Sequence, residues 1–158
     1  MYIQLLYMKD ITDIIKTKSH LPLAKRTVLN VSVTSINFKD GILSVLKPYD
    51  ISIEQFNVLR ILRGKNGEPS NLMDIQDRMI SKMSNTTRLV DKLILKNLVE
   101  RFVCENNRRK VDIYITDEGL KLLKLLDPII EEKENELTNK LEKEELETLN
   151  LLLTKIRG

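Results

Sequence analysis

The hydrophobic and polar positions of residues 84–96 follow the period of an α-helix. When each residue is advanced by roughly 100° around an axis, one side is formed by Thr86, Leu89, Val90 and Leu93. The opposite side is polar and consists of Ser84, Asn85, Thr87, Arg88, Asp91 and Lys92. This pattern predicts an amphipathic helix with one face on a core and the other face free. Asn97 follows where a left-handed C-terminal cap is expected, a conformation that asparagine tolerates better than most residues.

Two short segments after this helix alternate between faces with a period of two, which predicts β-strands. The first covers residues 98–104 and the second covers residues 111–116. The turn between them contains two asparagines, which accept a positive φ, and three adjacent cations, Arg108, Arg109 and Lys110. Such cations could simply keep a hairpin tip in solution. Because they follow a polar-faced helix, we interpret them instead as a basic wing for phosphates or for a narrow minor groove.

The segment before the polar-faced helix predicts two further helices. Ser52 and Gln55 have the spacing of a capping box, and apolar residues then recur at helical spacing until a glycine-containing loop. Asn71 can cap a short second helix that runs to about Met79. A brief turn leads into the polar-faced helix. Residues 51–116 are therefore expected to form helix, helix, turn, helix, strand, wing and strand.

Both ends of the chain carry more apolar residues than the packing of their own helices needs. Residues 24–47 and a long segment that opens at Asp117 are expected to be helical, and Pro128 should kink the second helix or split it near Asp127. The surplus apolar residues are Ile3, Leu5, Leu6, Leu149, Leu151, Leu152, Leu153 and Ile156. The simplest use of this surface is an interface between two copies related by a twofold axis. The alternative is a helical bundle formed within one chain.

The charge of the chain is distributed unevenly. The formal net charge is +3 over 158 residues. Residues 1–50 contain 7 basic and 4 acidic residues, residues 51–116 contain 12 and 8, and residues 117–158 contain 7 and 11. The three segments thus carry +3, +4 and −4. A basic centre beside an acidic C-terminal segment indicates that the centre faces nucleic acid and that the C-terminal segment has another task.

The composition argues against several other classes of protein. The single cysteine excludes a disulfide framework within the chain. The single histidine, His20, and the lack of a Cys/His cluster argue against a zinc site. The glycines form no phosphate-binding loop, so no enzyme site and no cofactor are expected. No apolar run approaches the roughly 20 residues that a membrane span needs, and no signal peptide is recognisable. The expected location is the cytoplasm.

Several segments of the central region carry a family resemblance. They are residues 53–60, 74–75, 84–93, 98–101 and 108–119. The most specific is the run Arg88-Leu89-Val90-Asp91-Lys92-Leu93, followed by a basic wing at this spacing. With these segments the chain resembles the MarR family of bacterial transcriptional regulators. The resemblance implies a twofold dimer with interleaved terminal helices, in which each central lobe reads one half-site and a small ligand or oxidant often weakens binding.

The chain departs from the family pattern at two places. The family usually has an aspartate just before the wing arginines, whereas this chain has Asn107. Asp91 is a candidate partner for a wing arginine instead, and Arg109 is favoured over Arg108 as the main wing residue. The peroxide-sensing branch of the family uses a cysteine near its N-terminus. Here the lone Cys104 lies on the strand that leads into the wing, so that mechanism does not transfer.

The sequence therefore predicts a mainly α protein with a small two-stranded β-wing, a winged helix-turn-helix joined to a terminal-helix dimerisation lobe. Residues 1–50 and 117–158 are the expected dimerisation segments, and residues 51–116 the DNA-binding lobe. The expected function is that of a homodimeric, sequence-specific transcriptional repressor on a near-palindromic double-stranded operator, released by a small-molecule effector. The residues expected to contact DNA are Ser84, Asn85, Thr87, Arg88, Lys92, Arg108 and Arg109.

Three other functions fit the same pattern. One of them, the dimerisation lobe of an enzyme, is set aside because the chain has no room for a catalytic domain, which leaves two. The first is a ligand- or protein-binding helical dimer whose DNA lobe no longer functions. The residues that argue against it are the retained Arg88, Lys92, Arg108 and Arg109. The second is a nonspecific architectural DNA binder. Gel-shift measurements on the protein's own promoter, with random DNA as competitor, separate both from a sequence-specific regulator.

Overall fold

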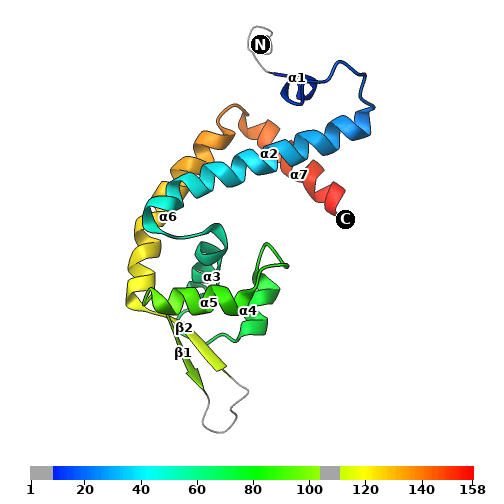
Figure 1. Cartoon of the computed structure of the whole chain (residues 1–158). Helices are drawn as coiled ribbons and strands as arrows, with labels where there is room; N and C mark the ends of the chain where they lie inside the picture. The colour runs from blue at the N-terminus through cyan, green and yellow to red at the C-terminus, as the bar shows by residue number, and fades with distance from the viewer. Residues whose placement is uncertain (1–8, 104–110) are drawn as a thin grey trace. The chain divides into compact units, whose positions relative to one another are not determined.

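The computed structural model describes residues 9–103 and 111–158 (Figure 1). The chain forms two compact units, Met1–Asp40 (unit 1) and Gly41–Gly158 (unit 2). Helices dominate, and the one sheet found in the described residues has two strands, so the expected fold class is confirmed. No helix in these described ranges combines the length and the apolar character that crossing a membrane requires. The same residues contain no cluster of three or more His, Cys, Asp or Glu side chains able to hold a metal ion.

Unit 1 contains the short helix α1 (Ile11–Ile14) and most of the long helix α2 (Leu23–Leu46), whose last turns belong to unit 2. Asp10 caps α1, because its carboxylate accepts a hydrogen bond from the Thr12 N–H at 2.9 Å. The same carboxylate pairs with Arg26 of α2 at 2.8 Å. The helix expected at residues 24–47 is thus confirmed, although its valines and threonines favour strands.

Unit 2 follows the order that the sequence predicted for its central part. Its further elements are η2 (Lys47–Tyr49), α3 (Ile53–Arg63), α4 (Leu72–Arg78), α5 (Thr86–Leu95), β1 (Val99–Val103), β2 (Val111–Ile115), α6 (Asp117–Thr138) and α7 (Lys143–Arg157). Three helices, a turn before the third of them, and two strands therefore occur in the expected sequence. The tip that joins β1 to β2 falls outside the described residues.

The core of unit 2 is built around α3. Its capping box forms as predicted: the Ser52 N–H donates to the Gln55 side chain at 3.0 Å, and the Gln55 N–H donates to the Ser52 hydroxyl at 3.2 Å. Helix α3 contacts α4, α5, α6 and β2. Its buried residues Phe56, Leu59 and Leu62 pack with apolar side chains from all four elements. These are Ile75, Val90, Leu93, Ile113, Leu123, Leu126 and Ile130.

The two strands are antiparallel, with Val99 opposite Ile115. A third extended segment was not predicted. Ser70 forms a β-bridge with Ile113. The Ser70 N–H donates to the Ile113 carbonyl at 3.0 Å, and the Ile113 N–H donates to the Ser70 carbonyl at 2.8 Å. Because Ile113 is fully buried, this bridge anchors the base of the wing to the loop before α4.

Helix α6 runs from Asp117 to Thr138 without a break, although Pro128 lies inside it. The expectation of a split near Asp127 is therefore wrong. Leu126 is fully buried just before the proline, and the Asp127 carboxylate pairs with both terminal nitrogens of Arg63 on α3. These contacts hold the helix on the core, while the exposed Pro128 ring faces solvent. The missing N–H of proline costs one helical hydrogen bond, and tertiary packing outweighs that loss.

Gly119 in the first turn of α6 is pressed against the start of the wing. A Cβ atom at this position would lie 2.4 Å from the Leu98 backbone oxygen and 2.7 Å from Cγ1 of Ile115. Alanine is favoured over glycine inside a helix by about 1 kcal/mol. A clash with backbone cannot be relieved by a rotamer change, however, and overpacking typically costs about 1–3 kcal/mol or more. We expect Gly119→Ala to lower the free energy of unfolding.

Urea denaturation at equal protein concentration measures this effect. Gly64→Ala is the matched control, because the nearest atoms to a Cβ there lie 3.5 Å away, at ordinary contact distance. The control should be as stable as the wild type or slightly more stable. Equal stability of the Gly119→Ala and Gly64→Ala variants would contradict the tight packing at Gly119.

Candidate nucleic-acid interface

Helix α5 has the two faces that the sequence predicted. It begins at Thr86, because the side chain of Asn85 caps it: Oδ1 accepts a hydrogen bond from the Arg88 N–H at 3.0 Å. Thr86 and Val90 are buried on the inner face. Just beyond the helix, Asn97 has a φ of 56°, which confirms the expected left-handed cap.

The position of α5 is fixed by Gln76 of α4, a residue that the sequence analysis missed. The Thr86 hydroxyl donates to the Gln76 carboxamide oxygen, and Gln76 Nε2 donates to the Lys82 carbonyl in the intervening turn at 2.5 Å. One side chain therefore ties α4, the turn and α5 together. The sequence feature that could have indicated this contact is Thr86, because a polar side chain on the buried face of a helix needs a hydrogen-bond partner. That requirement does not say which residue supplies the partner.

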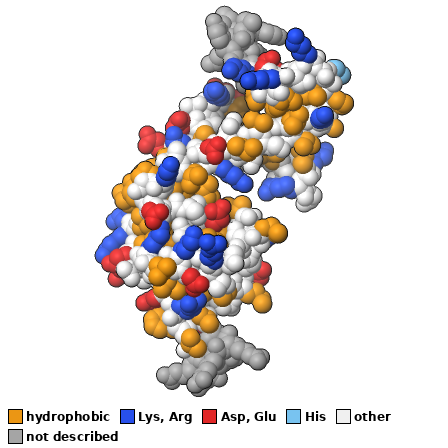
Figure 2. Space-filling view, viewed as in Figure 1, with side chains coloured by type: hydrophobic (Ala, Val, Ile, Leu, Met, Phe, Trp, Pro, Cys, Tyr) orange, Lys and Arg blue, Asp and Glu red, His pale blue; other side chains and the backbone are white. Residues whose placement is uncertain are grey.

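The outer face of α5 is free for a ligand. Thr87, Arg88 and Lys92 are exposed, Asn85 is exposed beside them, and Ser84 is half-buried. Within the described part of the chain, neither Arg88 nor Lys92 forms an ion pair. Figure 2 shows basic side chains grouped on the surface of this region, with acidic ones among them. A hollow of about 410 Å³ at the N-terminal end of the face is lined by Glu54, Ser81, Met83, Ser84, Asn85, Arg88, Leu89 and Lys92.

An ion pair connects α5 to the base of the wing. Asp91 Oδ1 lies 2.9 Å from Arg101 Nη1 of β1, and both side chains are less than half exposed. Among the described residues the partner of Asp91 is thus a strand residue. The wing arginines considered for this role, Arg108 and Arg109, lie outside the described residues, as does Cys104. The Asp91–Arg101 pair thus links α5 to the first strand of the sheet.

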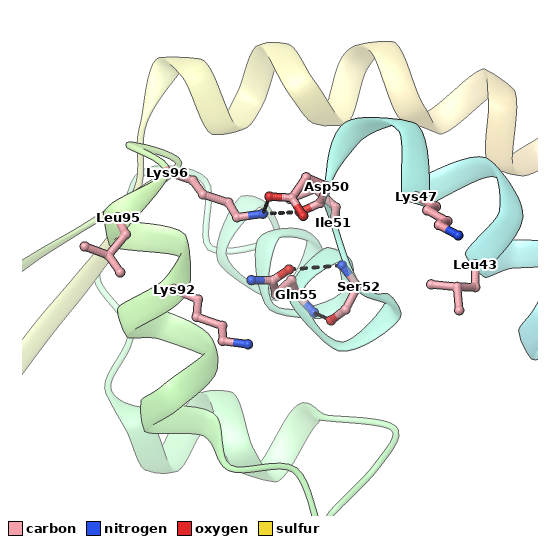
Figure 3. A pocket seen from close by; sticks show the side chains of 9 residues that line it. All are labelled: Leu43, Lys47, Asp50, Ile51, Ser52, Gln55, Lys92, Leu95 and Lys96. Atoms are coloured by element: carbon pink, nitrogen blue, oxygen red, sulfur yellow. Dashed lines mark hydrogen bonds and ion pairs between the residues drawn. The ribbon is translucent and has the colours of Figure 1, made fainter.

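The C-terminal end of α5 borders a second pocket of about 480 Å³ (Figure 3). Lys96 Nζ lies 2.6 Å from the Asp50 carboxylate and also donates to the Asp50 backbone carbonyl. Figure 3 shows Lys92 extending from α5 toward Ser52 and Gln55. The residues that line this pocket are Leu43, Lys47, Asp50, Ile51, Ser52, Gln55, Lys92, Leu95 and Lys96.

The Asp50 carboxylate at this pocket is held in its ionised form. The pKa of Asp50 lies below its ordinary value. The largest cause is the hydrogen bond from Lys96, followed by the positive charge of Lys96 and, with a smaller effect, that of Lys92. The stabilisation that this pairing gives is present above the ordinary carboxyl pKa of about 4 and is lost as the pH falls through the lower folded value. At neutral pH both partners of the pair therefore stay charged, and the pair links the end of α5 to the loop before α3.

Comparison with known sequences agrees with this geometry. The sequence model of the MarR family matches residues 51–111. The HTH-type transcriptional regulator TcaR of Staphylococcus aureus is 30% identical over 139 residues, which cover 86% of this chain and 87% of TcaR. The HTH-type transcriptional regulator YfiV of Bacillus subtilis is 33% identical over 75 residues, which cover 48% of this chain and 46% of YfiV. These relatives are transcriptional regulators and not enzymes.

Solved structures with the same fold include regulators with and without DNA. A MarR transcription factor from Planctomyces limnophilus is 30% identical and has a TM-score of 0.68 over 86% of this chain and 98% of that chain. A mutant of Escherichia coli MarR, solved in complex with operator DNA, has a TM-score of 0.74 over 96% of this chain and 100% of that chain. Its identity of 22% supports a shared fold alone. From the similarity to TcaR over most of both chains, the match to the family model and the winged helix-turn-helix architecture, we conclude that the chain belongs to the MarR family of winged-helix transcriptional regulators.

Proposed function

We propose that the protein is a dimeric, sequence-specific repressor that binds a near-palindromic operator in the cytoplasm and is released by a small ligand. The observation that carries this proposal is the outer face of α5. Arg88 and Lys92 are exposed there and have no ion-pair partner in the described residues, while Gln76 fixes the inner face. A preorganised helix with free cations and short polar side chains suits a major groove, where phosphates need positive charge and base edges need hydrogen-bonding groups.

The individual side chains fit different tasks in such a complex. Ser84, Asn85 and Thr87 lie at the N-terminal end of α5, where helix-turn-helix proteins contact base edges. The Asn85 Oδ1 atom is occupied by the cap, which leaves its Nδ2 group to donate to a base. Arg88 can bind the O6 and N7 atoms of guanine in a bidentate manner. Lys92, one turn farther along the helix, is placed to neutralise a phosphate.

The test of base reading is Arg88→Ala. The substitution should cost about 1–3 kcal/mol of specific binding and relax the preference at particular base pairs. The measurement is a fluorescence-anisotropy titration with a selected operator and with random DNA of the same length. Lys124→Ala on α6 removes the same charge from an exposed position outside the proposed DNA-binding residues. Once sedimentation velocity has shown that this variant is still dimeric, both affinities should be unchanged.

The same titration separates the alternative functions. Equal weakening on operator and random DNA would make Arg88 a phosphate contact and would favour an architectural binder. No preference of the wild type for DNA from its own promoter would favour a helical dimer whose DNA lobe has lost its function.

We also propose a role for the wing. Arg109, with Arg108 as a second contact, should enter or flank the minor groove, which is narrow and strongly negative in A·T-rich DNA. Both residues lie outside the described part of the chain. The support comes from their place in the sequence between the paired strands β1 and β2. The Asp91–Arg101 pair joins β1 to α5, the helix that presents Arg88.

The proposed dimer assigns residues 1–50 and 117–158 to assembly and residues 51–116 to DNA. The support is the number of large apolar side chains that the terminal helices leave exposed. In unit 1 these are Leu23, Val28, Val31, Ile36 and Phe38. In unit 2 they are Leu125, Leu149, Leu151, Leu152 and Ile156. Exposed apolar side chains in this number on the terminal helices indicate an interaction site, and a second copy would bury them.

The pocket in Figure 3 is the proposed effector site. It combines the cations of Lys47, Lys92 and Lys96 with one carboxylate, that of Asp50, so a positive charge remains for a ligand. Its apolar lining is formed by Leu43, Ile51 and Leu95. These features suit a small molecule with an apolar body and an acidic group. Such an effector would bind Lys92 in competition with the DNA phosphates, which links its binding to release of the operator.

A further inference from the structure

Two apolar side chains protrude from the turn between α4 and α5. Met83 is 95% exposed and Ile80 is 87% exposed, the highest values among the large hydrophobic residues that the structure describes. Single exposed apolar residues are common on protein surfaces, so exposure alone indicates nothing. The surroundings of the two side chains differ, however. Met83 lines the hollow at the N-terminal end of α5 together with Asn85 and Arg88, whereas Ile80 does not.

The backbone on both sides of Met83 is fixed. On one side, the Lys82 carbonyl accepts the hydrogen bond from Gln76. On the other side, the Ser84 N–H donates to the Ser81 carbonyl at 3.2 Å. Met83 therefore has an exposed side chain on a turn whose backbone is hydrogen-bonded, two residues before Asn85, the N-terminal cap of α5. The direction of its Cα–Cβ bond is set before any ligand arrives, which limits the backbone entropy lost when a ligand covers the side chain.

The charges around Met83 indicate what can cover it. The hollow contains the two cations of Arg88 and Lys92 and one carboxylate, that of Glu54, so it suits an anionic partner. The uncharged thioether side chain of Met83 has no group that would bind a phosphate favourably. The apolar groups that B-DNA presents in its major groove are the C5-methyl groups of thymine. Methionine is flexible and polarisable and adapts its shape to such a contact.

We propose that Met83 is a specificity-determining residue that packs on the C5-methyl group of a thymine, next to the base pair that Arg88 reads. This inference rests on the proposed function, because it requires the N-terminal end of α5 to enter the major groove. It adds an apolar readout to the polar contacts of Asn85 and Arg88. Each half-site of the operator should then contain one thymine whose methyl group contributes to affinity.

The experiment replaces operator thymines with deoxyuridine, one position of the half-site at a time and symmetrically in both half-sites. This substitution removes the methyl group and leaves every hydrogen-bonding atom in place. The operator is first selected from random double-stranded DNA with the wild-type protein. Affinities are then measured for the wild type, for Met83→Ala and for the matched control Ile80→Ala, which removes a similarly exposed side chain outside the hollow.

At one thymine position the wild type should lose about fourfold in affinity per methyl group, and thus about 15-fold for both half-sites of the operator. Met83→Ala should bind the thymine and deoxyuridine operators equally, with the affinity that the wild type has for deoxyuridine. Ile80→Ala should retain the full loss on methyl removal. Because Met83 is almost fully exposed, its replacement should not affect folding, which circular dichroism of the variant would confirm.

Three results would overturn the assignment. A Met83→Ala variant that still loses affinity on methyl removal would place the methyl contact elsewhere. A variant that weakens both operators equally would show that Met83 orders the turn or contacts the sugar-phosphate backbone. A wild type that is insensitive at every thymine, while Arg88→Ala still relaxes base preference, would remove the methyl readout and leave the proposed function intact. Failure of the proposed function has a different signature, the absence of any preferred sequence in the selection.

Discussion

A chain that ends at residue 147 should no longer form a dimer. Deleting residues 148–158 removes most of α7, with Leu149, Leu151, Leu152, Leu153 and Ile156. Each large apolar side chain contributes about 1.5–3 kcal/mol when it is fully buried, and an obligate dimer of this kind should bury on the order of 2,000 Å² or more. Sedimentation velocity should therefore show a monomer or an aggregate in place of the dimer.

Loss of the dimer should also abolish tight operator binding. Two linked recognition helices gain a factor of about 10² to 10⁴ over one, because the second contact becomes intramolecular. The truncated chain should lose at least about 100-fold in operator affinity on this account. A truncated chain that still sediments as a dimer would contradict the assignment of α7 to the interface.

Point variants separate lost assembly from lost folding. Leu151 is 70% exposed and Leu152 is 51% exposed in the single chain, so Leu151→Glu with Leu152→Glu should leave the monomer folded while it disrupts the dimer. The control is Lys143→Gln with Glu147→Gln, which removes an exposed ion pair on the same helix at 3.9 Å. Such exposed pairs contribute little to stability, and the control should remain dimeric.

The features that the sequence predicted correctly depend on local signals. The helix at α5 follows from the spacing of Val90 and Leu93 on one face, and both are fully buried. The capping box of Ser52 and Gln55 acts within four residues, and Asn97 adopts the left-handed conformation that its own side chain makes accessible. The residues that determine each of these features lie close together in the chain, so the local sequence pattern is enough to predict them.

The features that the sequence did not reveal depend on partners that are distant in the chain. Gln76 meets Thr86 across 10 positions, and Arg63 meets Asp127 across 64 positions. The second contact helps to keep α6 continuous through Pro128, which the local cost of proline argued against. The candidate site likewise combines features that local residues determine with features that depend on distant partners. The polar face of α5 follows from periodicity, whereas the Gln76 contact that positions it and the pairing of Asp91 with Arg101 require the fold.

The affinity of the dimer for its operator should fall steeply with salt. If each protomer neutralises about four phosphates through Arg88, Lys92 and the wing, the dimer releases the counterions of about eight phosphates. The slope of log K against log salt is about −0.9 per phosphate, which gives about −7. Raising the salt from 50 to 200 mM should then cost about 10⁴-fold in affinity.

The slope can be attributed to the wing by substitution. Arg108→Ala with Arg109→Ala removes two of the four contacts of each protomer and should reduce the slope to about −4. Lys124→Ala changes the net charge outside the proposed DNA-binding residues. If the variant is still dimeric, it should leave the slope near −7. An unchanged slope and affinity in the folded double variant would show that the wing does not contact DNA.

The two half-sites should be coupled through the dimer. In the proposed dimer, twofold symmetry would place the two α5 helices in major grooves on one face of the DNA, about 10 base pairs or one helical turn apart. Inserting about five base pairs between the half-sites turns one of them to the opposite face, so only one lobe can bind and affinity should fall to that of a single half-site. An effector that moves the lobes apart by a few ångströms would have the same consequence without touching the DNA-binding face. Footprinting over a series of spacer lengths measures the coupling, and equal affinity at every spacing would mean that the lobes bind independently and that release requires direct competition at Lys92.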